Sequence, residues 1–244
     1  MSARYAVYFS PAPHSAWWDA GAHWLGRDEC SDLPLHPGAW QKFSVDDWRA
    51  LTAAPRRYGF HATLKAPFRL REGVLERDLL RRLQDLADTL QQLALGPMRA
   101  VALGNFAALV PSAPSQELEA LASRCVTELD DLRAPLSAQD LARRDIESLD
   151  TRGVELLQRY GYPHVLERFR LHMSLSGVVD GATVQRVVAA WEKPLAQLNA
   201  ANPLLLDRLC LFVEAGPGQA FFRIADVLLQ YGATARAMGH RAAP

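Results

Sequence analysis

This chain carries one pattern twice, first in Tyr58-Gly59-Phe60-His61-Ala62-Thr63-Leu64-Lys65-Ala66-Pro67-Phe68 and again in Phe169-Arg170-Leu171-His172-Met173-Ser174-Leu175-Ser176-Gly177. In both segments an apolar residue precedes a histidine, and a hydroxyl residue followed by leucine comes two positions after it. Alternation of apolar and polar residues is typical of a β-strand with one buried face. We therefore expect two strands that each bury an apolar face and present a polar one.

The polar side chains of the two segments form two rows: Arg57, His61, Thr63 and Lys65 in the first, and Arg170, His172, Ser174 and Ser176 in the second. Side chains alternate between the faces of a strand, so the members of each row are expected on one face. Each row offers a cation, an imidazole and a hydroxyl. Two such rows facing each other would bind a phosphodiester, with two groups able to move protons near neutral pH.

Each histidine segment is followed by the same order of elements. A helix over 75–93 and strands at 98–103 and 106–110 are expected after the first segment, and a helix over 182–198 and strands at 204–213 and 220–228 after the second. The two units form a divergent internal repeat, which would place the histidines in equivalent positions about a pseudo-twofold axis.

The whole chain, 1–244, is interpreted as a single domain with two lobes. The lobes span 57–111 and 168–228, a helical connector covers 115–165, and an aromatic-rich insertion covers 14–55. A first strand is expected at 5–9, and short helices at 15–25 and 45–53. Five tryptophans, at positions 17, 18, 24, 40 and 48, gather in the insertion. They either pack this segment onto the body of the protein or stack on a ligand.

Composition limits the class of ligand. Lys plus Arg and Asp plus Glu both number 27 in the 244 residues, so no broad basic surface for long nucleic acid is expected. A small anion in a local positive pocket is compatible with this balance. The three cysteines form no Cys-x-x-Cys pattern, which indicates a reducing compartment. No apolar run reaches the roughly 18 residues of a membrane span, and we expect a cytoplasmic protein without a membrane partner.

The paired rows suit one reaction in particular. Opening a cyclic phosphodiester with water needs a base, an acid and donors that hold the non-bridging oxygens. His61 and His172 can supply the two proton transfers, in an order that the sequence leaves open. Thr63 and Ser174 lie about 6–7 Å along the strand from their histidines, close enough to bind the same phosphoryl group.

Four further side chains are candidates for the same ligand. Lys65, Arg57 and Arg170 can add charge-assisted hydrogen bonds to the phosphate. Tyr8 can touch the substrate if its strand face borders the groove. The scheme requires no metal and no other cofactor. His14, His23, His36 and Cys30 share the insertion, but their spacing matches no compact zinc pattern.

Together with Arg4-Tyr5-Ala6-Val7-Tyr8-Phe9, the two motifs resemble the two-histidine (2H) phosphoesterase superfamily, and more narrowly its branch associated with bacterial phosphonate-utilisation operons. The resemblance implies an α+β fold with two lobes of antiparallel sheet, outer helices and a central groove. It also implies a phosphoric diester hydrolase that opens a small nucleoside or ribose cyclic phosphate without a metal, with His61, Thr63, His172 and Ser174 as its catalytic set. Ser174 stands where threonine is commoner in the superfamily.

Other functions stay open or are weaker. A protein that binds a nucleotide or an RNA end in the same groove, without catalysis, is the main alternative. A serine hydrolase is disfavoured because the chain has no Gly-x-Ser-x-Gly motif, and a dinucleotide-binding enzyme because it has no Gly-x-Gly-x-x-Gly motif after a strand. The exact substrate and the oligomeric state are not determined by the sequence.

Overall fold

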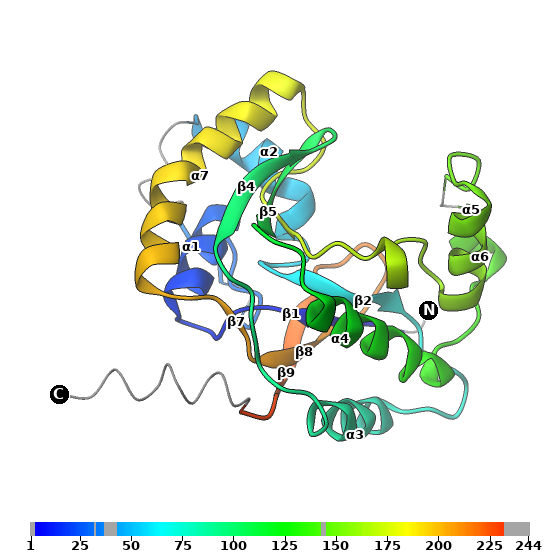
Figure 1. Cartoon of the computed structure of the whole chain (residues 1–244). Coiled ribbons are helices and arrows are strands. Elements are labelled where there is room, and N and C mark those ends of the chain that lie inside the picture. Colours follow the sequence, from blue (N-terminus) through cyan, green and yellow to red (C-terminus); the bar gives the residue numbers. More distant parts are fainter. Residues whose placement is uncertain (1–2, 32, 37–42, 143–144, 232–244) are drawn as a thin grey trace.

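The computed structural model describes residues 3–31, 33–36, 43–142 and 145–231 (Figure 1). Its strands are β1 (Arg4–Phe9), β2 (Ala62–Phe68), β3 (Leu93–Ala94), β4 (Met98–Leu103), β5 (Phe106–Pro111), β6 (Met173–Ser174), β7 (Leu205–Leu206), β8 (Arg208–Glu214) and β9 (Phe222–Leu228). Its helices are α1 (Ala16–Leu25), α2 (Val45–Arg56), α3 (Glu76–Ala87), α4 (Gln116–Thr127), α5 (Ala138–Ala142), α6 (Thr151–Tyr160) and α7 (Gly181–Ala201), with 3-10 turns η1 (Asp130–Leu132) and η2 (Leu166–Arg168). The mixture of helices and a mostly antiparallel sheet is the α+β class that was expected.

Seven strands form one sheet in the order β4-β5-β6-β2-β1-β8-β9. The two histidine segments are neighbours at its centre, where Ala62 of β2 pairs with Met173 of β6. The hairpin β4-β5, which follows the first histidine segment, pairs with β6 of the second. The hairpin β8-β9, which follows the second, pairs with β1 and through it with β2. Strands from the two halves of the chain therefore alternate in one sheet.

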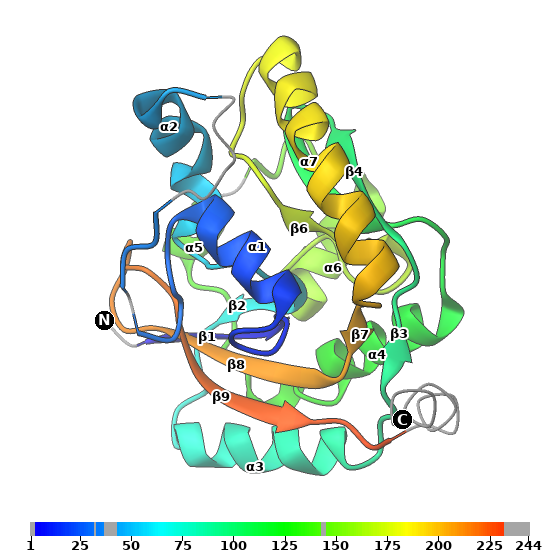
Figure 2. The ribbon, with the colours of Figure 1, turned by 90° about the vertical axis from the view of Figure 1, so that its left-hand side faces the viewer.

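Helices cover the sheet at different places. Helix α7 lies along β4 and β5, with α1 beside it, and α3 lies against β8 and β9 (Figure 2). Helix α4 packs on β2. Apolar side chains of these helices, such as Trp191 of α7, Leu83 of α3 and Leu121 of α4, join one large core with Val7 and Phe9 of β1. A smaller cluster on the other side of β1 contains Ala6, Tyr8, Cys210, Phe212 and Phe221.

Local sequence explains where the helices begin. The side chain of Ser115 accepts a hydrogen bond from the Leu118 amide at the start of α4, and Asp180 accepts one from Thr183 at the start of α7. Such caps satisfy amides that have no partner within the helix. Helix α3 ends at Ala87, earlier than the expected helix over 75–93. Leu93, the last residue of that range, instead begins β3, which pairs with β7, so a tertiary contact overrides the helical spacing there.

The second histidine segment differs most from expectation, because only Met173 and Ser174 form a strand. The preceding residues leave the turn η2 in an irregular path. Phe169, Leu171 and Leu175 are nevertheless buried in the main core. The alternation of apolar and polar residues in this segment therefore predicts which side chains are buried, but it does not predict the hydrogen bonds of a β-ladder.

The described tryptophans of the aromatic-rich segment serve packing. Trp17, Trp18, Trp24 and Trp48 are all buried, and the Trp24 ring meets that of Trp191 at 5.7 Å. Their indole N–H groups are used as well: that of Trp24 donates to Leu175 O and that of Trp48 to Trp24 O. Trp40 lies outside the described residues. The division into two lobes with these boundaries stays a prediction.

Among the described residues, no helix combines the length and the apolar character that crossing a bilayer requires.

Candidate functional site

A pocket of about 240 Å³ lies where the two histidine segments meet. Its lining brings together five of the predicted site residues with four others: Tyr8, Tyr58, His61, Thr63, Ala66, Pro67, Tyr162, His172 and Ser174. The pairing of β2 with β6 explains this, because it places Ala62 and Met173, the residues directly after the two histidines, side by side. The expected catalytic and hydroxyl residues of both halves therefore share one cavity.

Both histidine rings are oriented by the same kind of contact, with a backbone carbonyl two residues earlier in the chain. The Nδ1 atom of His61 lies 2.9 Å from Gly59 O, and that of His172 lies 2.9 Å from Arg170 O. A carbonyl oxygen only accepts hydrogen bonds, so Nδ1 of each ring carries the proton. The other ring nitrogen, Nε2, is then the one available to a ligand. A neutral ring accepts a proton there and a charged ring donates one.

The two rings have unequal surroundings. His61 stacks on Tyr8 with ring centres 4.0 Å apart, and Tyr58 and Phe212 lie at 5.9 and 6.3 Å. Burial among these rings, together with the smaller effect of the charge of nearby His172, lowers the pKa of His61 to about 4. His172 contacts one aromatic ring, Phe106 at 5.9 Å, within the described part of the chain. His61 is therefore neutral at neutral pH and suited to accept a proton.

The two hydroxyls occupy matching positions. Thr63 stands two residues after His61, and its Oγ1 lies 3.5 Å from Nε2 of that ring. Ser174 stands two residues after His172 in β6. Both are partly exposed to the pocket. Two hydroxyl groups and two Nε2 atoms around one small cavity suit a tetrahedral oxyanion, because each can form a hydrogen bond to a different oxygen.

Lys65 does not lie in this pocket, contrary to its place in the predicted row. Tyr8 pairs with Thr63, whereas the next residue of β1, Val7, pairs with Lys65, so Leu64 is an extra residue in β2. Such a bulge reverses the alternation that follows it. Lys65 is buried, and its Nζ donates to Val126 O at 2.9 Å and to Asp130 at 3.1 Å. Ala66 takes its place in the pocket lining.

The two arginines also lie outside the lining. Arg57 ends helix α2 instead of starting a strand, and its guanidinium binds Glu214 and donates to Gln219 O. It stacks over the ring of Tyr58, so its contact with the pocket is indirect. The Arg170 guanidinium folds back on its own backbone and donates to Phe169 O at 2.6 Å. Ser176 is buried and binds the backbone at Ala107 and Gly177.

Two tyrosines of the pocket were missed by the sequence analysis. Alternation places Tyr58 on the buried face with Phe60, but Gly59 has a φ of 80° and turns the chain before β2 begins. A non-glycine residue adopts such a φ only with strain, so this glycine is a local signal of the turn. Tyr162 comes from the connector, just after Gly161 ends α6. Nothing in its local sequence indicates a contact with the histidines.

In the described ranges of the chain, no three His, Cys, Asp or Glu side chains gather in a way that would hold a metal ion.

Comparisons with known proteins give a family and two relatives. The family model described as Protein of unknown function (DUF1045) matches residues 63–222. A protein of Janthinobacterium sp. (strain Marseille) is 41% identical over 221 residues, and one of Laribacter hongkongensis (strain HLHK9) is 35% identical over 219. Both are named ribose 1,5-bisphosphate phosphokinase PhnN. The matches cover 89% of this chain but 49% and 50% of the relatives, so the chain spans about half of their length.

These names correct one expectation. The resemblance implied a phosphoric diester hydrolase, whereas both relatives are named as a phosphokinase, which is a transferase. The hydrolase class is therefore wrong as judged by these relatives. The correction concerns the reaction class, and the geometry of the two-histidine pocket is independent of it.

Proposed function

The chain belongs to the DUF1045 family, and from this premise we propose that its two-histidine pocket binds a phosphate group of a small phosphorylated ribose and moves protons during phosphoryl transfer. One observation carries the proposal: two histidines, each oriented by a 2.9 Å contact from Nδ1 to a carbonyl, and two hydroxyls line the same pocket of about 240 Å³. The relatives' names supply the ligand class, because they are named for an action on ribose 1,5-bisphosphate.

The proposed step assigns different tasks to the two histidines. Neutral His61 takes the proton of an attacking hydroxyl, whose oxygen forms a new bond to phosphorus. The bond from phosphorus to the leaving oxygen breaks, and His172 supplies the proton that this oxygen needs. Thr63 and Ser174 hold the non-bridging oxygens while their charge changes. His61 is assigned the role of base because its pKa of about 4 keeps the ring neutral at neutral pH.

The relatives are named for a phosphokinase reaction, and we do not place the nucleotide-dependent part of such a reaction in this pocket. None of the three lysines in the sequence follows a glycine, so the chain has no Gly-x4-Gly-Lys-Ser/Thr motif to cradle nucleotide phosphates. We propose that this chain contributes recognition of the phosphorylated sugar and the proton transfers described above, and that the part of the relatives beyond the matched half contributes the nucleotide-dependent chemistry.

Membership of the two-histidine superfamily is part of the same proposal. The alternation of strands from both halves in the sheet supports a pseudo-twofold relation between the units, because each hairpin lies toward the histidine strand of the other unit. We also propose a link to phosphonate metabolism, which rests on the resemblance of the motif strings and on the PhnN label of the relatives.

The experiment combines binding and turnover. Ribose 1-phosphate, ribose 5-phosphate and ribose 1,5-bisphosphate are titrated by calorimetry, and movement of phosphoryl groups between hydroxyls is followed by ³¹P NMR. We expect His61→Gln and His172→Gln each to lower turnover by about 10²-fold or more, with a smaller change in affinity. His164→Gln is the matched control, because His164 is exposed and does not line the pocket. Absence of ribose phosphate binding, or full turnover in either variant, would refute the proposal.

A second candidate is a binding module without catalysis, and the aromatic walls of the pocket favour it. Tyr8, Tyr58 and Tyr162 can stack on a base or a sugar, as in proteins that bind nucleotides or RNA ends. In that case, the ligand binds with unit stoichiometry, the ³¹P spectrum of the bound ligand stays constant with time, and the histidine variants change affinity alone.

A further inference from the structure

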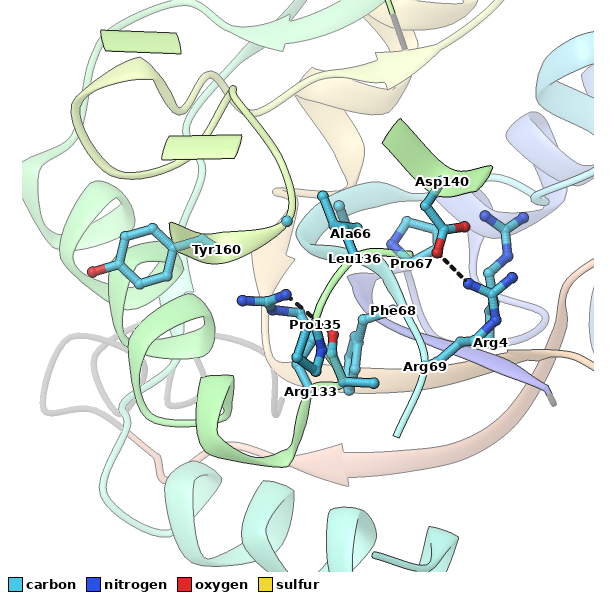
Figure 3. A pocket seen from close by; sticks show the side chains of 12 residues that line it. Arg4, Ala66, Pro67, Phe68, Arg69, Arg133, Pro135, Leu136, Asp140 and Tyr160 are labelled. Atoms are coloured by element: carbon cyan, nitrogen blue, oxygen red, sulfur yellow. Dashed lines mark hydrogen bonds and ion pairs between the residues drawn. The ribbon is translucent and has the colours of Figure 1, made fainter. Parts of the chain in front are cut away.

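A second cavity, of about 260 Å³, adjoins the two-histidine pocket and is lined by three arginines, Arg4, Arg69 and Arg133 (Figure 3). We propose that it binds a second phosphate group of the same ligand, so that the protein recognises a sugar carrying two phosphates. The inference rests on the proposed function, since it extends the ligand from the histidine pocket into the arginine cavity.

The two cavities are neighbours along the same strand. Ala66 and Pro67 of β2 line both of them. Consecutive residues of the connector also border the two cavities, since Tyr160 and Gly161 line the arginine cavity and Tyr162 lines the histidine pocket. From Thr63 to Ala66 the strand rises by about 10 Å. The length of an arginine side chain shortens the gap between the two phosphate positions to less than this rise. A phosphorylated sugar can therefore have one phosphate near the histidines and the other near the arginines.

Charge around the cavity is unbalanced although the whole chain is neutral. Glu214 binds both Arg4 and Arg57, and Asp130 binds both Lys65 and Arg133, so each of these carboxylates serves two cations. Asp140, the third carboxylate, pairs with Arg69. Among the residues that line the cavity, three arginines face one carboxylate, Asp140, which leaves an excess of two positive charges in the lining. That excess suits a doubly charged phosphate monoester.

The arginines also have unused donors. A guanidinium offers five N–H groups. Among the described residues, the hydrogen bonds found for the Arg4 side chain use Nε alone, and those of Arg69 use Nη1 alone. Figure 3 shows Arg4 and Arg69 on one side of the cavity and Arg133 on the other, with Ala66 and Pro67 between them. Arg4 and Arg69 can therefore donate hydrogen bonds to a phosphate in the cavity, whereas Arg133, whose Nε, Nη1 and Nη2 already donate to Asp130, Ala134 O and Arg159 O, contributes mainly its charge.

One carboxylate already occupies part of the cavity. Asp140 of α5 accepts a hydrogen bond from Arg69 at 2.6 Å, and it also binds the amide and the hydroxyl of Ser137. The Arg69 hydrogen bond, with those from Ser137, holds the pKa of Asp140 well below its usual range, so the group is an anion at neutral pH. Part of each side chain is accessible, 25% for Arg69 and 16% for Asp140, so a phosphate that enters the cavity can reach the pair and compete for Arg69. An incoming phosphate can therefore displace Asp140 from Arg69.

The experiment separates the second phosphate from the first. Ribose 1-phosphate, ribose 5-phosphate and ribose 1,5-bisphosphate are titrated into the protein and into Arg69→Gln, Asp140→Asn and Arg81→Gln. We expect the bisphosphate to bind the unsubstituted protein at least about 10-fold more tightly than either monophosphate. Arg69→Gln should remove most of that advantage and leave the better monophosphate unchanged. Asp140→Asn should raise the bisphosphate affinity several-fold, because the competing anion is lost while the amide still accepts from Ser137.

Arg81→Gln removes one exposed positive charge outside both cavities and should change nothing. Equal affinity for mono- and bisphosphates in the unsubstituted protein would overturn the second phosphate site and leave the first intact. A bisphosphate advantage that survives in Arg69→Gln and does not grow in Asp140→Asn would overturn it as well. Failure of all three ligands to bind would instead overturn the proposed function on which the inference rests. Circular dichroism of each variant verifies that it is folded, and the gain expected for Asp140→Asn does not depend on the Arg69 variant.

Discussion

The two histidine segments have nearly the same sequence pattern, yet they differ in structure. His61 stands just before a seven-residue strand and is enclosed by Tyr8 and Tyr58, whereas His172 stands before a strand of two residues and has Phe106 as its aromatic neighbour. The backbone contact at Nδ1 is the same for both rings. Because the Nδ1 contact is shared and the burial differs, the two imidazoles suit the different tasks proposed for them, with the more buried His61 as the neutral ring.

The turn before His61 gives the largest contrast between the segments. Gly59 has a φ of 80°, and a Cβ built on it would lie 2.7 Å from Cβ of Glu29, which is buried. We expect Gly59→Ala to lower the free energy of unfolding by about 2–5 kcal/mol, from backbone strain together with this overlap. The corresponding change in the second segment, Arg170→Ala, should cost less than about 1 kcal/mol, since Arg170 is exposed. Urea unfolding of both variants measures the difference, and equal losses would show that the segments are held alike.

A smaller effect is expected in the dependence of stability on pH. Burial depresses the pKa of His61 in the folded protein to about 4, whereas it is about 6.5 in an unfolded chain. Between these values the unfolded state binds more protons, so the contribution of His61 makes stability fall as pH falls from 6.5 to 4, by at most about 3 kcal/mol.

This loss should be absent from His61→Gln, which has no group that titrates in that range. Unfolding free energies of the two proteins at pH 7 and pH 4.5 are therefore compared. If the unsubstituted protein and His61→Gln lose the same stability, His61 titrates normally and its assignment as the proton acceptor is wrong.

The hydroxyls should give the smallest effect. Thr63→Val and Ser174→Ala each remove one proposed donor to the phosphate, and a hydrogen bond to a charged group contributes about 1.5–3 kcal/mol. We expect each variant to bind ribose phosphates about 10- to 100-fold more weakly while remaining as stable as the parent protein. Calorimetric titration tests this. A loss confined to Thr63→Val would mean that the phosphate contacts the first segment alone.

Much of the architecture follows from local sequence. The helices at 16–25, 45–56 and 181–201 and the hairpins at 98–111 and 208–228 lie close to the expected ranges. The pocket also forms where the two motifs predict it, with His61, Thr63, His172, Ser174 and Tyr8 in its lining. Periodicity and turn residues are sufficient for the helices and hairpins, because each depends on neighbours in the sequence, whereas the pocket was predicted from the pattern that the two distant motifs share.

What could not be predicted depends on contacts between distant segments. The bulge at Leu64 exists because of how β1 pairs with β2, and it moves Lys65 from the pocket into an ion pair with Asp130. The arginine cavity likewise combines Arg4, Arg69 and Arg133 from three separate parts of the chain. No local pattern records either arrangement. The reaction class was a different kind of error, since it was inferred from the paired histidine rows and from a resemblance, and the names of the relatives corrected it.

The alternation of strands from the two halves has a consequence for how the protein assembles. Because β6 pairs with both β5 and β2, neither half of the chain can satisfy its own strand edges when synthesised alone. The central pairing joins Ala62 and Met173, more than a hundred positions apart, and pairings with such long sequence separation slow folding. The two imidazoles meet only when that pairing has formed, so the proposed phosphate site exists only in the fully paired sheet.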